Sequence, residues 1–219
     1  MKPTSKLSFK IAAVLFKGLF RIMIRYEIGG RENLPANGPV IAVCNHLHHI
    51  DPVLHIISIL PRDSIFMAKE GLFHYWPFPL TRILMDIAEA FPVNYRGTPE
   101  EIKRAIRQAE KVLAEGLVFG IYPEGTRSRT SQLKEAYHGT AIIACRSRAP
   151  LIPVGIWGTE KLKGIGWLSR PKITISFGQP FTLPPTEGEP TNDQLKPLTN
   201  FIMKQLAAVL PPEYRGKYK

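Results

Sequence analysis

The segment TPEEIKRAIRQAEKVLAEGLVFGIYP, residues 98–123, decides the fold class. Its first part predicts a helix that Gly116 ends, because Thr98 and Glu101 have the spacing of a capping box and apolar residues recur every three or four positions. Its second part, 117–123, is a short apolar run and predicts a buried strand. A helix that leads directly into a buried strand is typical of an α/β protein.

The same alternation continues along the chain. Further strands are expected at 39–45, 64–69, 90–96, 151–158 and 172–180, and further helices after Asp51, at 138–149 and at the C-terminal end. Asp51 and Pro52 predict a helix start, with Asp51 as the N-cap. We therefore expect residues 28–219 to form one α/β domain with a central mixed, mostly parallel sheet flanked by helices, and functional residues in the loops after the strands.

The N-terminal segment KLSFKIAAVLFKGLFRIMIRY, residues 6–26, predicts a separate amphipathic helix within residues 1–27. Its five basic residues fall within an arc of about 100° on a helix, and apolar residues cover the rest. Such a helix suits the interface of an anionic bilayer, although a core helix with a solvated lysine edge is the alternative. The repeated charges argue against a membrane-spanning helix and against a signal peptide.

The composition is strongly basic. The chain has 29 Lys and Arg against 18 Asp and Glu, a net charge of +11, which favours an anionic partner such as nucleic acid, a membrane surface or a phosphorylated substrate. No nucleic-acid-reading motif occurs, so we expect no nucleic acid partner. The two cysteines form no C-x-x-C pair, which argues against a disulfide scaffold or a cysteine zinc cluster.

The stretch CNHLHHIDP, residues 44–52, carries the densest group of reactive side chains. A metal site is disfavoured, because the spacing H-x-H-H-x-D lacks the histidine that should follow the aspartate in a metallo-β-lactamase-type site. Cys44 lies within a predicted strand, where a free cysteine is usually a buried apolar residue. The remaining interpretation is that His46 is a general base and that Asp51 orients its ring. The alternative is that Asp51 only caps the helix.

A second group, IYPEGTRSR at residues 121–129, follows another predicted strand. It contains two arginines, and Arg96 follows the strand before it. The planar guanidinium group suits recognition of phosphate, whereas any single arginine is more often a solvated surface charge. Several arginines in loops after strands favour an anion-binding site.

Together these motifs resemble the glycerolipid acyltransferase family, typified by 1-acyl-sn-glycerol-3-phosphate acyltransferases. NHLHHID matches the family's NH-x4-D motif, YPEGTRS its (F/Y)PEGTRS motif, FPVNYRG its middle block and APLIPVGI its fourth block. The motifs occur in the family's order over roughly residues 28–180. Two positions depart from the family pattern, Tyr95 where an aspartate is common and Tyr137 where a lysine is frequent. These departures concern the head-group preference more than the reaction.

The resemblance implies acyl transfer from acyl-CoA or acyl-carrier protein to the sn-2 hydroxyl of lysophosphatidic acid, which gives phosphatidic acid. It implies no metal and no cofactor. His46 and Asp51 are the expected catalytic residues. The expected substrate-binding residues are Asn45, Arg96, Glu124, Gly125, Thr126, Arg127 and Pro153. We expect the protein to associate with anionic phospholipid at the cytoplasmic face of the cell membrane. Related acceptors (glycerol 3-phosphate, another lysophospholipid, a lyso-ornithine lipid), a non-catalytic basic membrane-binding protein and a metallohydrolase are the alternatives.

Overall fold

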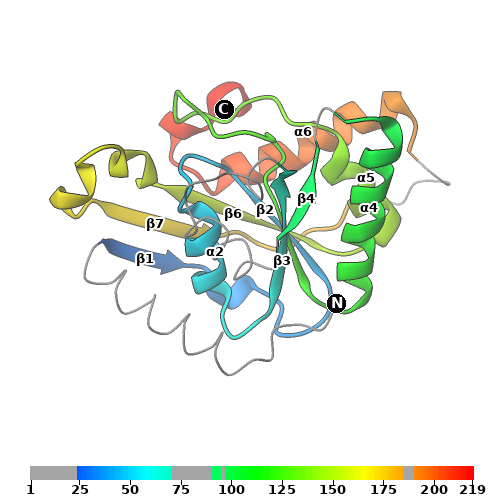
Figure 1. Ribbon diagram of the computed structural model, residues 1–219, viewed down its shortest axis with the longest axis horizontal. Coiled ribbons are helices and arrows are strands. Elements are labelled where there is room, and N and C mark those ends of the chain that lie inside the picture. The colour runs from blue at the N-terminus through cyan, green and yellow to red at the C-terminus, as the bar shows by residue number, and fades with distance from the viewer. Residues whose placement is uncertain (1–23, 71–89, 95–96, 185–189) are drawn as a thin grey trace.

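A seven-stranded sheet forms the centre of the molecule (Figure 1). The computed structural model describes residues 24–70, 90–94, 97–184 and 190–219. The strands are β1 (Arg25–Gly29), β2 (Val40–Cys44), β3 (Ser64–Lys69), β4 (Phe91–Val93), β5 (Val118–Ile121), β6 (Leu151–Trp157) and β7 (Lys172–Phe177). Their order across the sheet is β1-β7-β6-β2-β5-β3-β4, and every pair is parallel except β6 and β7. The expected mixed, mostly parallel sheet is therefore confirmed.

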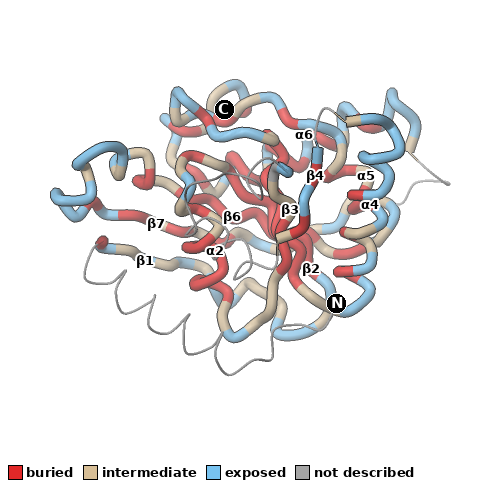
Figure 2. The backbone as a smooth tube through the Cα atoms, in the orientation of Figure 1, coloured by how far each residue is buried: buried red, intermediate tan, exposed pale blue. Residues whose placement is uncertain are grey.

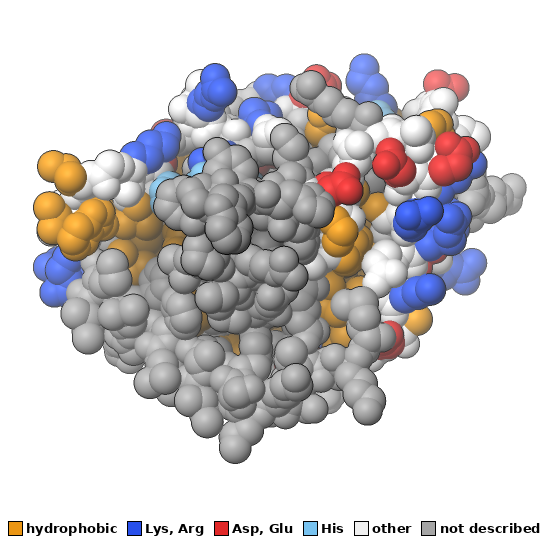
Figure 3. All heavy atoms as spheres, in the orientation of Figure 1, with side chains coloured by type: hydrophobic (Ala, Val, Ile, Leu, Met, Phe, Trp, Pro, Cys, Tyr) orange, Lys and Arg blue, Asp and Glu red, His pale blue; other side chains and the backbone are white. Residues whose placement is uncertain are grey.

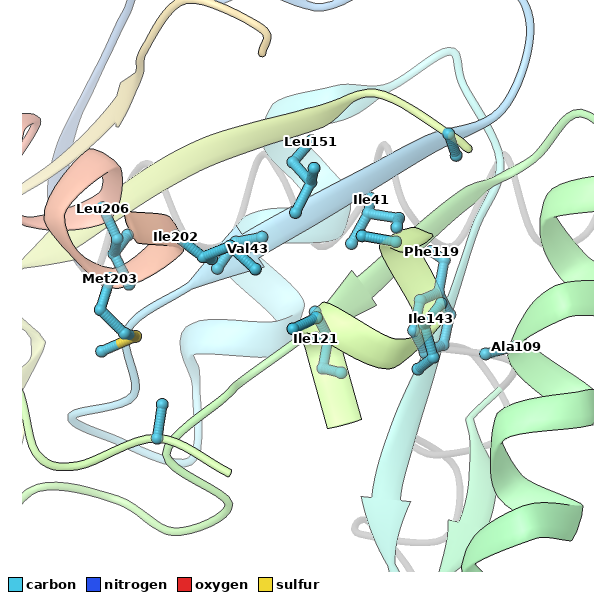
Figure 4. Packing of buried hydrophobic residues seen from close by; sticks show 14 of the residues in the cluster. Ile41, Val43, Ala109, Phe119, Ile121, Ile143, Leu151, Ile202, Met203 and Leu206 are labelled. Carbon is cyan, nitrogen blue, oxygen red and sulfur yellow. The ribbon is translucent and has the colours of Figure 1, made fainter. Parts of the chain in front are cut away.

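Helices cover both faces of the sheet. The longer helices are α2 (Asp51–Ile59), α4 (Pro99–Ala114), α5 (Gly139–Ser147) and α6 (Asn192–Ala208). On the central strand β2, Ile41 and Val43 belong to the hydrophobic cluster shared with α4, α5 and α6, part of which Figure 4 shows. The alternate residues Val40, Ala42 and Cys44 belong to the cluster shared with α2. Figure 2 shows the result, a sheet whose central strands are buried on both faces.

Helix α4 forms where the capping box predicts it. The amide of Glu101 donates to Thr98 Oγ1 at 3.3 Å, and Glu101 Oε2 accepts from the amide of Thr98 at 2.7 Å. Its buried residues are Ala105, Ile106, Ala109, Val112 and Leu113. The apolar spacing predicts Ile102 on this buried face as well, but Ile102 is 40% exposed.

The N-terminal prediction needs one correction. A helix was expected to extend to residue 26, but Arg25–Gly29 form β1, which pairs in parallel with β7. The exposed-to-intermediate alternation of β1 is that of an edge strand with one face on the protein. The rest of the expected amphipathic helix, up to residue 23, lies outside the described residues, as do residues 71–89.

The parallel pairing brings three strand ends to one edge of the sheet. Val43 of β2 is in register with Ile121 of β5, and Cys44 is in register with Val154 of β6. The segments that follow β2, β5 and β6 consequently leave the sheet side by side. Carboxyl ends of parallel strands are where ligands bind in open α/β sheets.

Candidate active site

A histidine and a carboxylate are paired in the segment between β2 and α2. His46 Nδ1 lies 2.9 Å from Asp51 Oδ2, with Asp51 fully buried and the His46 side chain 18% exposed. A carboxylate oxygen only accepts hydrogen bonds, so Nδ1 carries the proton and donates it to Asp51. The Nε2 atom of His46 is then the unprotonated nitrogen of the neutral ring and can accept a proton.

The side chain of Asp51 also holds the backbone of the segment before it. The amides of Leu47 and His48 both donate to Asp51 Oδ2 at 2.7 Å. The expectation that Asp51 is the N-cap of α2 is wrong, because Ile50 takes that position and Asp51 is the first helical residue. Its carboxylate faces backwards, toward the turn that holds His46, which is the geometry of an orienting group rather than of a helix cap.

Asn45 fastens the same turn to the neighbouring strand. Its Nδ2 donates to the carbonyl of Ile156 at 2.7 Å, and its Oδ1 accepts from the Ile156 amide at 2.7 Å. Asn45 is 2% exposed. The Nδ2 and Oδ1 atoms of Asn45 thus continue the β2–β6 pairing past Cys44. Because His46 is the next residue, this pairing positions His46.

We expect Asn45→Ala to lower the free energy of unfolding by about 2–4 kcal/mol, because it leaves a buried N–H and a buried C=O of Ile156 without a partner. Urea unfolding followed by circular dichroism measures the loss. Asn33→Ala is the matched control, since Asn33 Nδ2 donates to the carbonyl of Phe177 at 3.1 Å and its Oδ1 accepts from Gln179 Nε2 at 3.0 Å, both in a less buried place. Equal losses in the two variants would contradict the bracing role of Asn45.

The segment after β5 is joined directly to the histidine turn. The amide of Ser128 donates to the His46 carbonyl at 2.7 Å, and the His46 amide donates to Glu124 Oε1 at 3.3 Å. The ring of Tyr122 packs against the His46 ring, with centroids 4.4 Å apart. The NH-x4-D and PEGTRS motifs, which are about 75 residues apart in the sequence, therefore form one site.

Glu124 occupies the interior of this site rather than its surface. It is 3% exposed, and its second oxygen, Oε2, accepts from the Lys134 amide at 3.0 Å. Burial raises the pKa of Glu124 to about 7, against the opposing effect of the Lys134 and His46 amides. Through these contacts Glu124 holds the loop after β5 and the turn of His46 together, and its carboxyl group faces the His46 backbone amide.

The raised pKa of Glu124 predicts a pH-dependent stability. The folded state binds this proton more tightly than the unfolded state, so the stabilisation is complete below about pH 4.5 and is lost as the pH rises to about 7. The loss corresponds to roughly 3 kcal/mol. Glutamine does not titrate, so Glu124→Gln does not lose this stabilisation. As the pH rises from about 4.5 to about 7, we expect its free energy of unfolding to increase by that amount relative to that of the original chain. Urea unfolding at a series of pH values measures the difference. Parallel pH curves would contradict this assignment.

Two positively charged residues that follow β5, Lys134 and Arg127, have different surroundings. Lys134 Nζ donates to Thr126 Oγ1 and, at 3.3 Å, to the Arg127 carbonyl, which fixes the backbone of the loop. The Arg127 side chain is exposed. Burial lowers the pKa of His48, Asp51 opposes this effect, and Arg127 lowers the pKa further. Burial and then Arg127 also lower the pKa of His49. The Arg127 guanidinium is thus close enough to act electrostatically on both imidazoles.

Gly125 allows the sharp bend that brings Arg127 to this place. Its φ of +66° lies in the left-handed region, and a Cβ there would come within 2.7 Å of the Tyr137 ring. The Tyr137 amide donates to the Pro123 carbonyl at 2.9 Å. Tyr137, at the position where the family often has lysine, packs over this glycine in the present chain.

The cysteine alternative meets a physical obstacle. Cys44 is fully buried, and burial raises its pKa well above the usual value, with the charge of Asp51 as a second cause. Its Sγ lies 3.1 Å from His55 Nδ1, and burial lowers the pKa of His55 to about 3. A neutral thiol beside a neutral imidazole is a packing pair, because the nucleophile would have to be the thiolate.

The remaining expected site residues have separate positions. Pro153 is buried within β6, in register with Val43, and its carbonyl accepts from the Gly178 amide at 2.9 Å, so it lies inside the sheet rather than in the loops around His46. Arg96 lies outside the described residues. Within the described part of the chain, no three His, Cys, Asp or Glu side chains are grouped to hold a metal ion.

Sequence reasoning missed three contributors to the site. Tyr122 is the aromatic position of the YPEGTRS motif, so the motif itself held a signal for it. Ser128 is the last position of the same motif. Lys134 carried no such signal, because its role depends on the contact of its amide with Glu124, which the fold of the loop brings about.

Comparison with known proteins agrees with this geometry. The chain is 28% identical to a 1-acyl-sn-glycerol-3-phosphate acyltransferase of Bacillus subtilis, over 90% of this chain and 94% of that protein. It is 28% identical to the enzyme of the same name from Borreliella burgdorferi, over 71% of this chain and 60% of that one. The crystal structure of the LPA acyltransferase PlsC from Thermotoga maritima has the same fold, with a TM-score of 0.64 at 22% identity, over 92% of this chain and 79% of that one. The model of the Acyltransferase family matches residues 25–157, more than half of the sequence, and the chain therefore belongs to the Acyltransferase family.

Proposed function

We propose that this protein transfers an acyl group from a thioester donor to the sn-2 hydroxyl of 1-acyl-sn-glycerol 3-phosphate and so makes phosphatidic acid. The observation that carries the proposal is the pairing of His46 Nδ1 with the buried carboxylate of Asp51 at 2.9 Å, beside a loop that presents Arg127. The relatives that bear this activity in their names support the choice of acceptor.

The reaction follows from the chemistry of the pair. His46 Nε2 accepts the proton of the acceptor hydroxyl as its oxygen attacks the thioester carbonyl, and Asp51 stabilises the imidazolium that results. Collapse of the tetrahedral intermediate forms the ester, breaks the carbon–sulfur bond and returns the proton to the departing thiolate. A thiolate is a good leaving group, so this sequence balances without a covalent enzyme intermediate.

The charges around His46 suit a phosphorylated acceptor. Arg127 is exposed, and its charge contributes to lowering the pKa values of His48 and His49, after burial as the main cause. The nearest carboxylates, Asp51 and Glu124, are buried and turned toward backbone amides. A phosphate next to Arg127 consequently meets hydrogen-bond donors and no exposed carboxylate from these residues. Phosphate binding would hold the hydroxyl in place for His46.

An acceptor panel tests the proposed substrate. The purified full-length protein is given acyl-CoA or acyl-carrier protein together with lysophosphatidic acid, glycerol 3-phosphate, lysophosphatidylcholine or monoacylglycerol. We expect the highest kcat/KM with lysophosphatidic acid, measured by thiol release and by mass spectrometry of the product. A preference for another acceptor would change the substrate but keep the reaction. Transfer to none of them, in well-folded protein, would contradict the proposed enzyme.

Arg127→Ala is expected to raise the KM for lysophosphatidic acid by about 10–100-fold, since a charged hydrogen bond contributes about 1.5–3 kcal/mol. The KM for monoacylglycerol, which lacks the phosphate, should change little. Arg129→Ala is the matched control, because Arg129 is an exposed arginine of the same loop. If Arg127→Ala leaves the KM for the phosphorylated acceptor at the original value, the phosphate assignment is wrong.

We also propose that the protein works at a membrane surface on the cytoplasmic side. In the described part of the chain, no helix has the length and apolarity to span a bilayer. The net charge of +11 supports adsorption to anionic lipid, which the cytoplasmic leaflet carries. Vesicle co-sedimentation with and without anionic lipid measures this adsorption.

A further inference from the structure

The connection between β6 and β7, residues 158–171, carries an exposed apolar surface. Three neighbouring side chains are involved: Ile165 is 78% exposed, Leu168 is 61% exposed and Trp167 is 46% exposed. Figure 3 shows hydrophobic side chains gathered at the left end of the molecule, where Figure 1 places this connection. We call Ile165, Trp167 and Leu168 the apolar tip. Contiguous exposed apolar surface of this kind marks an interaction site more often than isolated exposed residues do.

The apolar tip is held away from the core by its own backbone. Two short 3₁₀ turns, Thr159–Leu162 and Gly166–Ser169, follow one another. The Leu168 amide donates to the Ile165 carbonyl at 3.0 Å, and Ser169 Oγ donates to the Gly166 carbonyl at 2.7 Å. A Cβ on Gly166 would come within 1.9 Å of the Lys161 carbonyl oxygen, so the turns are closely packed on each other.

The charges around the apolar tip have one sign. Lys161, Lys163 and Arg170 flank it and are exposed. The only acidic residue from 158 to 172 is Glu160, which faces inward: its Oε1 accepts from Tyr214 Oη at 2.8 Å, and its Oε2 accepts from the Gly158 amide at 2.9 Å. An apolar tip surrounded by cations is complementary to the interface of an anionic bilayer, where acyl chains lie beneath phosphate groups.

The position of the apolar tip relates it to the active site. Strand β6 runs parallel to β2, so its carboxyl end emerges at the same edge of the sheet as the turn that holds His46. Asn45 joins the two strands there through Ile156. Lys163 also lies near enough to His48 to contribute, after burial, Arg127 and His46, to the lowering of its pKa. A membrane that contacts the apolar tip therefore lies at the same edge of the sheet as His46.

We infer that residues 161–170 are a membrane-docking loop, with the apolar tip inserted among the lipids of an anionic bilayer and Lys161, Lys163 and Arg170 at the level of the lipid phosphates. The inference does not depend on which acceptor the active site uses, because docking is measured without turnover. It also does not depend on other segments that bind lipid, because the tryptophan of the apolar tip reports its own surroundings.

The direct test uses Trp167 as a depth probe. In the full-length chain, Trp76→Phe and Trp157→Phe leave Trp167 as the sole tryptophan. The protein is bound to vesicles of phosphatidylcholine and phosphatidylglycerol whose acyl chains are brominated or not. We expect brominated lipid to quench Trp167 and the emission to shift to shorter wavelength. Should this variant fail to fold, the quenchable emission that Trp167→Phe removes from the original chain gives the same answer.

Affinity measurements complete the test. We expect the triple variant Ile165→Ser, Trp167→Ser, Leu168→Ser to bind anionic vesicles roughly 30-fold more weakly, from the apolar area it removes. Lys161→Gln with Lys163→Gln should weaken binding about fivefold per charge on anionic vesicles and leave binding to neutral vesicles unchanged. The control Ile102→Ser, Phe201→Ser removes two other exposed apolar side chains, which are 40% and 41% exposed, and should bind like the original chain.

Three results would overturn the inference. The first is a full-length protein that does not bind the vesicles. The second is a bound protein whose Trp167 emission brominated lipid leaves unchanged, which would instead favour an acidic protein as the partner of the apolar tip. The third is a triple variant, folded by circular dichroism, that binds anionic vesicles as tightly as the Ile102→Ser, Phe201→Ser control.

Discussion

His46→Ala is expected to lower kcat for acyl transfer by about 10²–10⁴-fold, the contribution that a general base typically makes. The variant loses the Nε2 atom that accepts the hydroxyl proton, while the Leu47 and His48 amides still hold Asp51 in place. Vesicle binding should not change, because the basic and apolar surfaces are intact. Steady-state thiol release at saturating donor and acceptor measures the effect.

His138→Ala is the matched control for this variant. His138 is an exposed histidine whose Nδ1 lies 2.8 Å from Thr199 Oγ1, between α5 and α6 and outside the His46 site. It should keep nearly the original kcat. If His46→Ala folds and is as active as His138→Ala, His46 is not the base.

Asp51→Asn is expected to lower kcat by a similar factor, about 10²–10⁴-fold, for a different reason. The asparagine oxygen can still accept from the Leu47 and His48 amides, but the side chain loses the negative charge that stabilises the imidazolium of His46. The KM for the acceptor should change less than kcat, because the residues assigned to phosphate binding are untouched.

The effect of Asp51→Asn on the free energy of unfolding can be separated from its effect on kcat. Asp51→Ala also removes the acceptor of the buried Leu47 amide and the partly buried His48 amide, so it should be less stable than Asp51→Asn by about 2–4 kcal/mol and unfold at a lower urea concentration. If Asp51→Asn retains full activity, the carboxylate of Asp51 only shapes the turn that holds His46.

Local patterns were sufficient for most of the fold. The capping box at Thr98 and Glu101 predicted the start of α4, and the run SIFMAK predicted β3 with its observed bounds. Strand β1 was missed because its partner, β7, is far along the sequence, and because the apolar run before it suggested one continuous helix. A pairing between distant segments leaves no local periodicity.

In the candidate site, too, local motifs were predictable, whereas contacts between distant segments were not. The motif spacing indicated that His46, Asp51 and the PEGTRS loop belong together, since β2 and β5 were expected to share a sheet. It could not show that Asn45 bonds to Ile156, that Glu124 faces the His46 amide, or that Asp51 points back toward the turn instead of capping α2. Nor does the sequence distinguish an exposed Trp167 from a core tryptophan, because that difference depends on the backbone of the whole β6–β7 connection.

A single-turnover experiment with labelled acyl donor tests most directly whether His46 removes the proton from the lipid hydroxyl. The original chain and His46→Ala are mixed with labelled acyl-CoA and lysophosphatidic acid, quenched at short times and separated into protein and lipid. We expect the label to pass from the donor to phosphatidic acid without appearing on the protein, and to remain on the donor in His46→Ala. Label that accumulates on the protein on the way to product, or transfer by His46→Ala at the original rate, would contradict the account.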